Sequence, residues 1–180
     1  MTALCRSSAV CLGLALSLAG VARAAPSLET IETKHLTVAI SAPPAAVAPG
    51  GRVSLTLEVT PRSTMHVYAP GQKDYIAISL AIQPDPAVTA GAARFPPPEK
   101  LLLKALGETQ LVYRRPFRIA QDVTVARTAA IRARARTPGA TVAVTGTLRY
   151  QACDDIICYV PVDVPVVWTI ALKPSEGATP

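Results

Sequence analysis

The sequence reads Tyr150-Gln151-Ala152-Cys153-Asp154-Asp155-Ile156-Ile157-Cys158-Tyr159 near its carboxyl end. Apolar residues alternate with polar ones before this stretch, over residues 141–149, and again after it, over residues 160–172. Two alternating segments around a short acidic tip predict a β-hairpin. We therefore expect the two cysteines to lie where the chain reverses, one on each side of the turn.

Four further segments predict strands, and the first three of them alternate in the same way. They are residues 36–40, 52–60, 76–82 and 111–119, the last interrupted by Pro116. Residues 65–68 form a shorter run that ends at a turn. Gly146, inside the strand before the cysteines, predicts a bulge or a bend, and Trp168 in the last strand is expected in the core.

Residues 130–136 also alternate, with Ile131, Ala133 and Ala135 between three arginines. A period of two predicts a strand with all three arginines on one side. That side is either a solvated face or a docking face for an acidic partner.

The chain has 180 residues, half of them apolar, with 17 prolines, 10 glycines and no long helical period. Many short strands between Pro and Gly turns predict an all-β fold, an immunoglobulin-like antiparallel β-sandwich. We expect one domain over residues 35–172, preceded by a loose polar lead-in at residues 25–34 and followed by a polar tail at residues 173–180.

The first 24 residues have the features of a secretory signal peptide. Arg6 precedes an apolar run over residues 9–21, which is short for a membrane span, and Ala22-Arg23-Ala24 is a small-x-small cleavage site. Cleavage after Ala24 leaves two of the four cysteines, in an oxidising compartment. We expect a periplasmic protein without stable membrane insertion after signal removal; a short membrane anchor is the alternative.

The formal net charge of +6 is mild, and two of the basic residues lie in the expected signal. Nucleic-acid-binding proteins usually concentrate basic residues on one face together with aromatic ones, whereas only 4% of these residues are aromatic. We therefore expect no nucleic-acid partner.

The pair Cys153 and Cys158 allows three interpretations. Two cysteines in an exported chain often form a structural disulfide, but closing so short a loop is worth only about 2 kcal/mol. A bridge at an exposed tip is typical of labile, redox-active disulfides. The third interpretation, a soft copper site with His66 and Met65, lacks a tight cluster of ligands, and we predict neither a metal nor a cofactor.

Asp154 and Asp155 should raise the pKa values of the neighbouring thiols, because negative charge favours the neutral form. Arg149 would offset part of this effect. A thiol with a raised pKa is a poor attacking group at neutral pH. Such thiols suit a relay protein that meets specific partners better than they suit a general oxidant.

The segment of residues 100–108 contains four leucines, including Leu103 and Leu106. Loops are usually polar, so this segment is either a loop folded onto the core or a lid over a site. The prolines at positions 96–98 exclude a central strand just before it.

At the cysteine stretch the sequence resembles the amino-terminal periplasmic domain of the thiol–disulfide interchange protein DsbD. The residues that carry this resemblance are Tyr150 to Cys153, two acids, Cys158-Tyr159 and Pro161. Residues 65–70, which include Tyr68, and residues 95–113 resemble two further blocks of the same family, so the likeness extends over most of residues 35–172.

The resemblance implies an immunoglobulin-like domain with protein-disulfide reductase chemistry. Its partners would be thioredoxin-like periplasmic proteins or a membrane electron-transfer protein. It also implies that Cys158 is the sulfur attacked in mixed disulfides and that Cys153 resolves them. We expect Tyr68, Tyr150, Asp154, Asp155 and Tyr159 to support the pair, and Leu103 and Leu106 to form its cap loop.

The chain differs from the best-known members of this family at three places. It has four residues between the cysteines instead of five, and Val160 stands where they have the first proline after the tyrosine. Leu103, Lys104, Ala105 and Leu106 stand where their cap loop carries two acids and an aromatic residue.

Overall fold

The computed structural model describes residues 28–41, 43–103 and 107–174. The expected signal peptide, Leu106 and the end of the polar tail lie outside these ranges. The elements are β1 (Leu28–Glu32), β2 (Leu36–Ser41), β3 (Arg52–Pro61), β4 (His66–Tyr68), β5 (Ser79–Ile82), β6 (Val88–Arg94), β7 (Glu99–Leu103), β8 (Glu108–Tyr113), β9 (Phe117–Val125), α1 (Ala129–Arg134), β10 (Thr141–Tyr150), β11 (Ala152–Cys153) and β12 (Val162–Ala171).

Two antiparallel sheets form a sandwich, one in the order β1-β2-β3-β9-β6 and the other in the order β12-β10-β5. Without β1, the first sheet has the A-B-E-D order of an immunoglobulin domain and the second has its G-F-C order. The prediction of an all-β, immunoglobulin-like antiparallel sandwich is confirmed.

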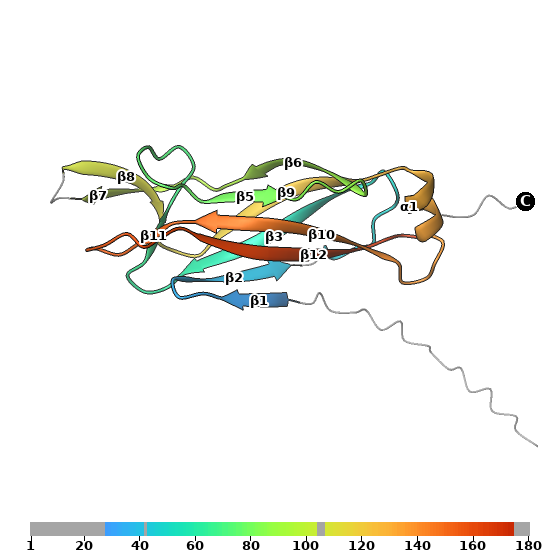
Figure 1. Cartoon of the computed structure of the whole chain (residues 1–180), viewed down its shortest axis with the longest axis horizontal. Coiled ribbons are helices and arrows are strands. Elements are labelled where there is room, and N and C mark those ends of the chain that lie inside the picture. Colours follow the sequence, from blue (N-terminus) through green and yellow to red (C-terminus); the bar gives the residue numbers. More distant parts are fainter. Residues whose placement is uncertain (1–27, 42, 104–106, 175–180) are drawn as a thin grey trace, which may run out of the picture.

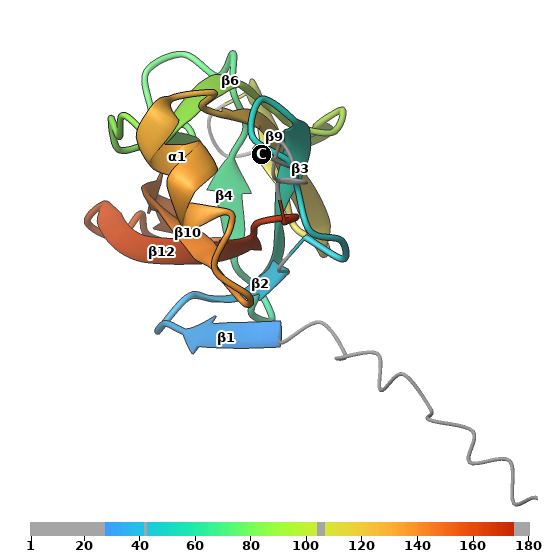
Figure 2. The same cartoon turned by 90° about the vertical axis from the view of Figure 1, so that its right-hand side faces the viewer.

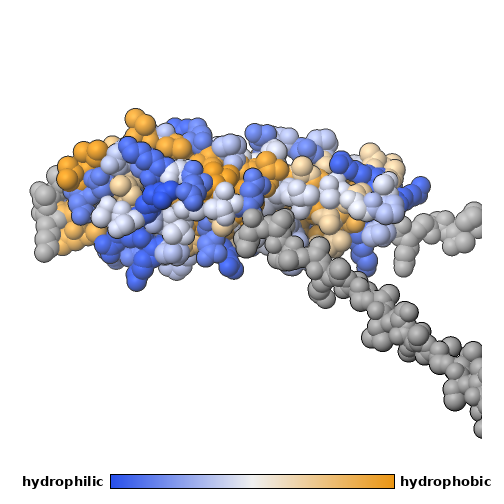
Figure 3. All heavy atoms as spheres, turned by 90° about the horizontal axis from the view of Figure 1, so that it is seen from below, coloured by the Kyte–Doolittle hydropathy of each residue, from blue (hydrophilic) through white to orange (hydrophobic). Residues whose placement is uncertain are grey.

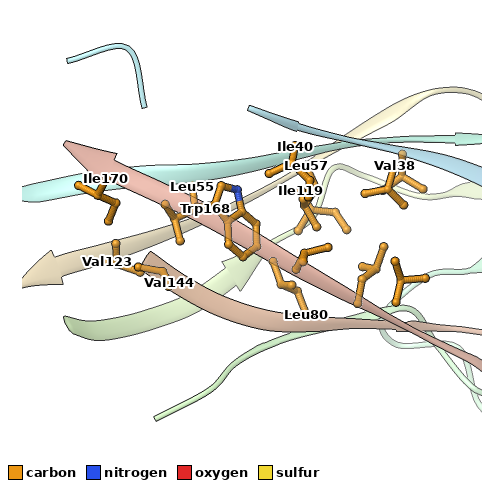
Figure 4. Packing of buried hydrophobic residues seen from close by; sticks show 14 of the residues in the cluster. Val38, Ile40, Leu55, Leu57, Leu80, Ile119, Val123, Val144, Trp168 and Ile170 are labelled. Atoms are coloured by element: carbon orange, nitrogen blue, oxygen red, sulfur yellow. The ribbon is translucent and has the colours of Figure 1, made fainter. Parts of the chain in front are cut away.

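The core lies between these two sheets, where β2, β3, β9, β10 and β12 bury alternate residues. Leu55 and Leu57 from β3 are fully buried, as are Ile119 from β9 and Leu148 from β10. Trp168 of β12 is 1% exposed, and its indole Nε1 donates a hydrogen bond to the carbonyl oxygen of Thr56, 3.2 Å away. Figure 4 shows this indole packed among side chains from both sheets, as expected for a core residue.

A third, smaller sheet in the order β11-β4-β8-β7 lies at one end of the sandwich. The helix α1 lies at the opposite end (Figures 1 and 2). The cysteines therefore lie on a small sheet that continues the sandwich lengthwise and is remote from the helix.

The structure corrects the prediction of a strand at residues 130–136, because this segment forms α1. The side chain of Thr128 caps the helix by accepting the backbone N–H of Ile131. Ile131 and Ala135 are buried four residues apart, while Ala133 is exposed, which is helical spacing. In the described residues, no helix is long and apolar enough to cross a membrane.

The prediction of a loose lead-in at residues 25–34 is also wrong in part, because residues 28–32 form β1. This strand pairs antiparallel with β2, and Ile31 packs against the core. The edge of β2 offers backbone N–H and C=O groups with which residues 28–32 pair. The short, polar sequence of these residues gives no sign of that pairing.

Residues 99–103 form β7, which pairs with β8, so this part of the leucine-rich segment is a strand and not the expected loop. The strand predicted at residues 76–82 begins only at Ser79.

Gly146 causes no bulge, since β10 pairs with β12 in unbroken register. A Cβ atom at position 146 would lie 2.9 Å from the carbonyl oxygen of Ala81 and 3.3 Å from the Trp168 ring. The glycine therefore makes room for the neighbouring strand and the indole.

Candidate functional site

The hairpin predicted around the cysteines is present, and its tip is closed by a disulfide between Cys153 and Cys158. The two residues also face each other as an antiparallel bridge, and their Cα atoms are 4.0 Å apart. The amide of Tyr159 donates to the carbonyl of Ala152, which continues the pairing one step toward the sandwich.

The two sulfur-bearing residues differ in their access to solvent. Cys153 is 0% exposed and belongs to a small buried cluster with Tyr68 and Val112. Cys158, in contrast, is exposed. Of the two residues, Cys158 is therefore the one that another molecule can contact directly.

The hydroxyl of Tyr68 lies 3.3 Å from Cys153 Sγ and 3.4 Å from Cys158 Sγ. Disulfide sulfurs carry no hydrogen, so the tyrosine is the donor to either sulfur. Burial raises the pKa of Tyr68 to about 12, and the hydroxyl therefore keeps its proton at neutral pH. Tyr75 stacks on the Tyr68 ring, with 4.3 Å between the ring centroids, which fixes the orientation of the hydroxyl.

The pairing of β11 with β4 brings these groups together. Val67 pairs with Ala152, and both side chains pack in the core of the sandwich. Because side chains alternate along a strand, His66 and Tyr68 project to the opposite face. His66 pairs directly with Cys153 on that face.

The acidic tip is held by Asp154. Its Oδ1 accepts the backbone N–H groups of Ile156 and Ile157, each at 2.8 Å, and its Oδ2 accepts the hydroxyl of Tyr159 at 2.9 Å. The hydrogen bonds from Ile157 and Ile156, followed by that from Tyr159, lower the pKa of this carboxyl. Asp154 thus acts first as the structural residue of the turn.

A hollow of about 490 Å³ lies beside the disulfide and is lined by both cysteines and by Leu101, Leu102 and Leu103 of β7. Its rim is unusually apolar for a surface, because Leu102 is 56% exposed and Ile156 is 90% exposed. Figure 3 shows hydrophobic atoms gathered at this end of the molecule. Contiguous exposed apolar surface is a common feature of interaction sites on soluble proteins.

The other residues expected at the site have different surroundings. Asp155 is exposed and lines the hollow, whereas Tyr150 is buried in the sandwich and its hydroxyl bonds to that of Thr33 at 2.9 Å. Arg149 pairs with Asp163 at 3.0 Å rather than with the acids of the tip. Leu103 borders the hollow, and Leu106 lies outside the described residues.

Two contributors to the site were given no role from the sequence, although Gln151 belongs to the stretch that carries the family resemblance. Tyr75 orients Tyr68, and Gln151 links the hairpin to the segment before β5, with its Nε2 donating to the carbonyl of Tyr159 and its Oε1 accepting the amide of Ile76. Both residues act through non-local contacts, and neither lies in an alternating pattern that would have indicated it.

The geometry suits thiol–disulfide exchange, with one accessible sulfur, one buried sulfur and a hydroxyl donor between them.

Within residues 28–41, 43–103 and 107–174, no group of three or more His, Cys, Asp or Glu side chains is placed to hold a metal ion. A bridged Cys153 and Cys158 have no thiolate to offer as a ligand.

Comparison with known proteins gives one family model and several similar solved structures. The family model described as thiol:disulfide interchange protein DsbD, N-terminal, matches residues 35–166. The crystal structure of the N-terminal periplasmic domain of ScsB from Proteus mirabilis is 13% identical over 84% of this chain and 53% of that one, with a TM-score of 0.49. The chain thus spans about half the length of that structure, and no curated protein sequence matches it.

Proposed function

The chain belongs to the family of the N-terminal domain of the thiol:disulfide interchange protein DsbD, and we propose that it is a periplasmic relay that exchanges its disulfide with thioredoxin-like proteins. The observation that carries this proposal is the asymmetry of the pair, with Cys158 exposed and Cys153 buried. A bridge made only for stability would gain more from joining distant strands.

In the reducing half of the cycle, a thiolate of the partner attacks Sγ of Cys158. The bond between Cys153 and Cys158 breaks, its electron pair leaves on Cys153 Sγ, and a mixed disulfide forms between the partner and Cys158. The second thiol of the partner, as a thiolate, then attacks the partner's own sulfur in that bond and displaces Cys158 as a thiolate. The domain gains two electrons, and the partner leaves with a disulfide.

Tyr68 supports the first of these steps. Its hydroxyl already lies within reach of both sulfurs, so it can donate a hydrogen bond to the negative charge that develops on the leaving sulfur. A donor placed before the reaction stabilises developing charge without reorganisation. The leucines of β7 border the same space and support a role in limiting access by small thiols.

The apolar rim supports a protein partner. Leu102 and Ile157 are both more than half exposed, and Ile156 is almost fully exposed. A folded partner that docks here would bury these apolar side chains around Cys158, whose sulfur is attacked. Burial of apolar surface at the centre of an interface favours such docking. The signal-like sequence over residues 1–24 supports export to the periplasm.

Trapping of the mixed disulfide tests the proposal. Cys153→Ser removes the resolving sulfur and leaves Cys158 able to bond a partner. Expressed in the periplasm, this variant should accumulate a reductant-sensitive covalent adduct with a thioredoxin-like protein, identified by mass spectrometry.

Cys158→Ser is the matched control, since it keeps a single cysteine at the buried position. It should form little or no adduct. An absence of adduct with both variants, or equal adducts with both, would reject the relay and leave the bridge as a structural staple.

A further inference from the structure

His66 is a buried histidine that the exchange steps described so far do not use. It is 2% exposed, and its Nε2 has no hydrogen-bond partner among the described residues. Leaving a buried polar nitrogen unpaired is unfavourable, and such groups in native structures often have a functional reason.

The position of His66 relates it directly to the buried sulfur. His66 pairs with Cys153 across β4 and β11, and side chains directly opposite on one face of an antiparallel pair have Cβ atoms about 5 Å apart. Its ring meets that of Tyr68 edge-on, with centroids 5.6 Å apart. Both His66 and Cys153 line the hollow beside the disulfide.

From this placement we propose that His66 is the acid–base residue for Cys153. The inference rests on the proposed function and assigns it a further catalytic residue. In the oxidising half of the cycle, Cys158 carries the mixed disulfide and Cys153 is a thiol. The neutral imidazole takes the thiol proton, the Cys153 thiolate attacks Cys158 Sγ, and the partner's sulfur leaves with the electron pair. The imidazolium then releases this proton to solvent. In the reducing half, His66 takes a proton from solvent and gives it to the Cys153 thiolate, which returns the imidazole to its neutral form.

The surroundings of His66 favour a base at neutral pH. Burial is the main cause that lowers its pKa below the ordinary 6.5, and the positive charge of Arg114 acts in the same direction. The acids of the hairpin tip oppose this shift and stabilise the imidazolium once it forms. The charged groups that face His66 from the neighbouring elements are Asp154, Asp155, Glu99, Arg114 and Arg115.

The resolving step can be isolated with dithiobis(nitrobenzoate) and the reduced protein. The exposed Cys158 reacts first and releases one coloured thionitrobenzoate, and attack by Cys153 then releases the second. In the wild-type protein, the rate of the second release should rise with pH through the pKa of His66 and then level off below the ordinary thiol pKa of about 8.5.

His66→Gln should slow the second release at pH 7 by about 100-fold, the lower range for general base catalysis. Its rate should keep rising through the thiol pKa and approach that of the wild type in alkali, where the thiolate forms without a base. His35→Gln is the matched control, because it removes the other buried histidine and should keep the wild-type pH midpoint. His66→Asn provides a second, smaller substitution with the same expected profile.

A His66→Gln or His66→Asn protein with the wild-type pH profile would overturn the inference, as would a slow release that persists equally at all pH values. Either result would leave the relay itself standing if Cys153→Ser still traps a partner. The converse outcome is that Cys153→Ser traps no partner while His66→Gln still changes the pH profile as expected. That result would reject the relay and leave the role of His66 standing.

Discussion

The sandwich and the small sheet at its end bury their side chains to different degrees. The core cluster of the sandwich draws on every strand of both large sheets except β1 and extends to α1. The sheet with the disulfide packs one face, with Val67, Tyr113 and Ala152, into that core. Its other face forms a separate cluster of Tyr68, Val112 and Cys153, next to the exposed Leu102 and Ile156. The disulfide therefore lies on the face of the small sheet that is directed away from the sandwich core, and we expect the bond at the tip to open while the sandwich stays intact.

The largest effect on stability should come from the sandwich. Trp168→Ala removes a fully buried indole that packs between the sheets, and such substitutions cost about 4 kcal/mol of unfolding free energy. Urea denaturation followed by circular dichroism measures the loss. Val167→Ala is the matched control on the same strand, because its side chain is partly exposed, and it should change stability by less than about 1 kcal/mol. Similar losses of unfolding free energy in the two variants would contradict the view that burial between the two large sheets determines stability.

Opening the disulfide should cost less. The bridge closes a loop with four residues between its ends, so its entropic contribution is about 2 kcal/mol. The reduced protein should therefore remain folded, with a lower urea midpoint and unchanged circular dichroism in the absence of denaturant. Unfolding on reduction, or a loss as large as that of Trp168→Ala, would show that the small sheet and the sandwich are a single stability unit.

The same division explains what the sequence could predict. In the sandwich, alternation directly encodes burial, so β2, β3, β10 and β12 were recognised from their apolar positions. In residues 130–136, however, Ile131 and Ala135 share a face in either a strand or a helix. The cap at Thr128 and the helix propensity of alanine decide for the helix.

At the site, the cysteines and the turn residues were predictable because they are close in sequence. The pairing of β4 with β11 joins residues more than eighty positions apart, and no local pattern reports such a contact. For this reason the sequence indicated Tyr68 only through its resemblance to a family. It left the pairing of His66 with Cys153 unseen and gave no sign of the stacking by Tyr75.

The smallest effect should come from the acidic tip and should depend on pH. The backbone N–H groups of Ile157 and Ile156 bond the ionised carboxylate of Asp154 and lower its pKa. A carboxyl whose pKa is lower in the folded state stabilises that state above its unfolded pKa of about 3.9, and this contribution disappears as the pH falls through the lower folded pKa. Wild-type protein should thus be slightly more stable than Asp154→Asn at pH 7, and the difference should vanish in stronger acid. Thermal denaturation between neutral and acidic pH measures this difference in stability.

Asp155→Asn is the matched control. It removes the same charge one residue along, where the carboxylate makes no such backbone hydrogen bonds among the described contacts. An equal, pH-dependent loss in both variants would mean that net charge, rather than the Asp154 turn, holds the tip.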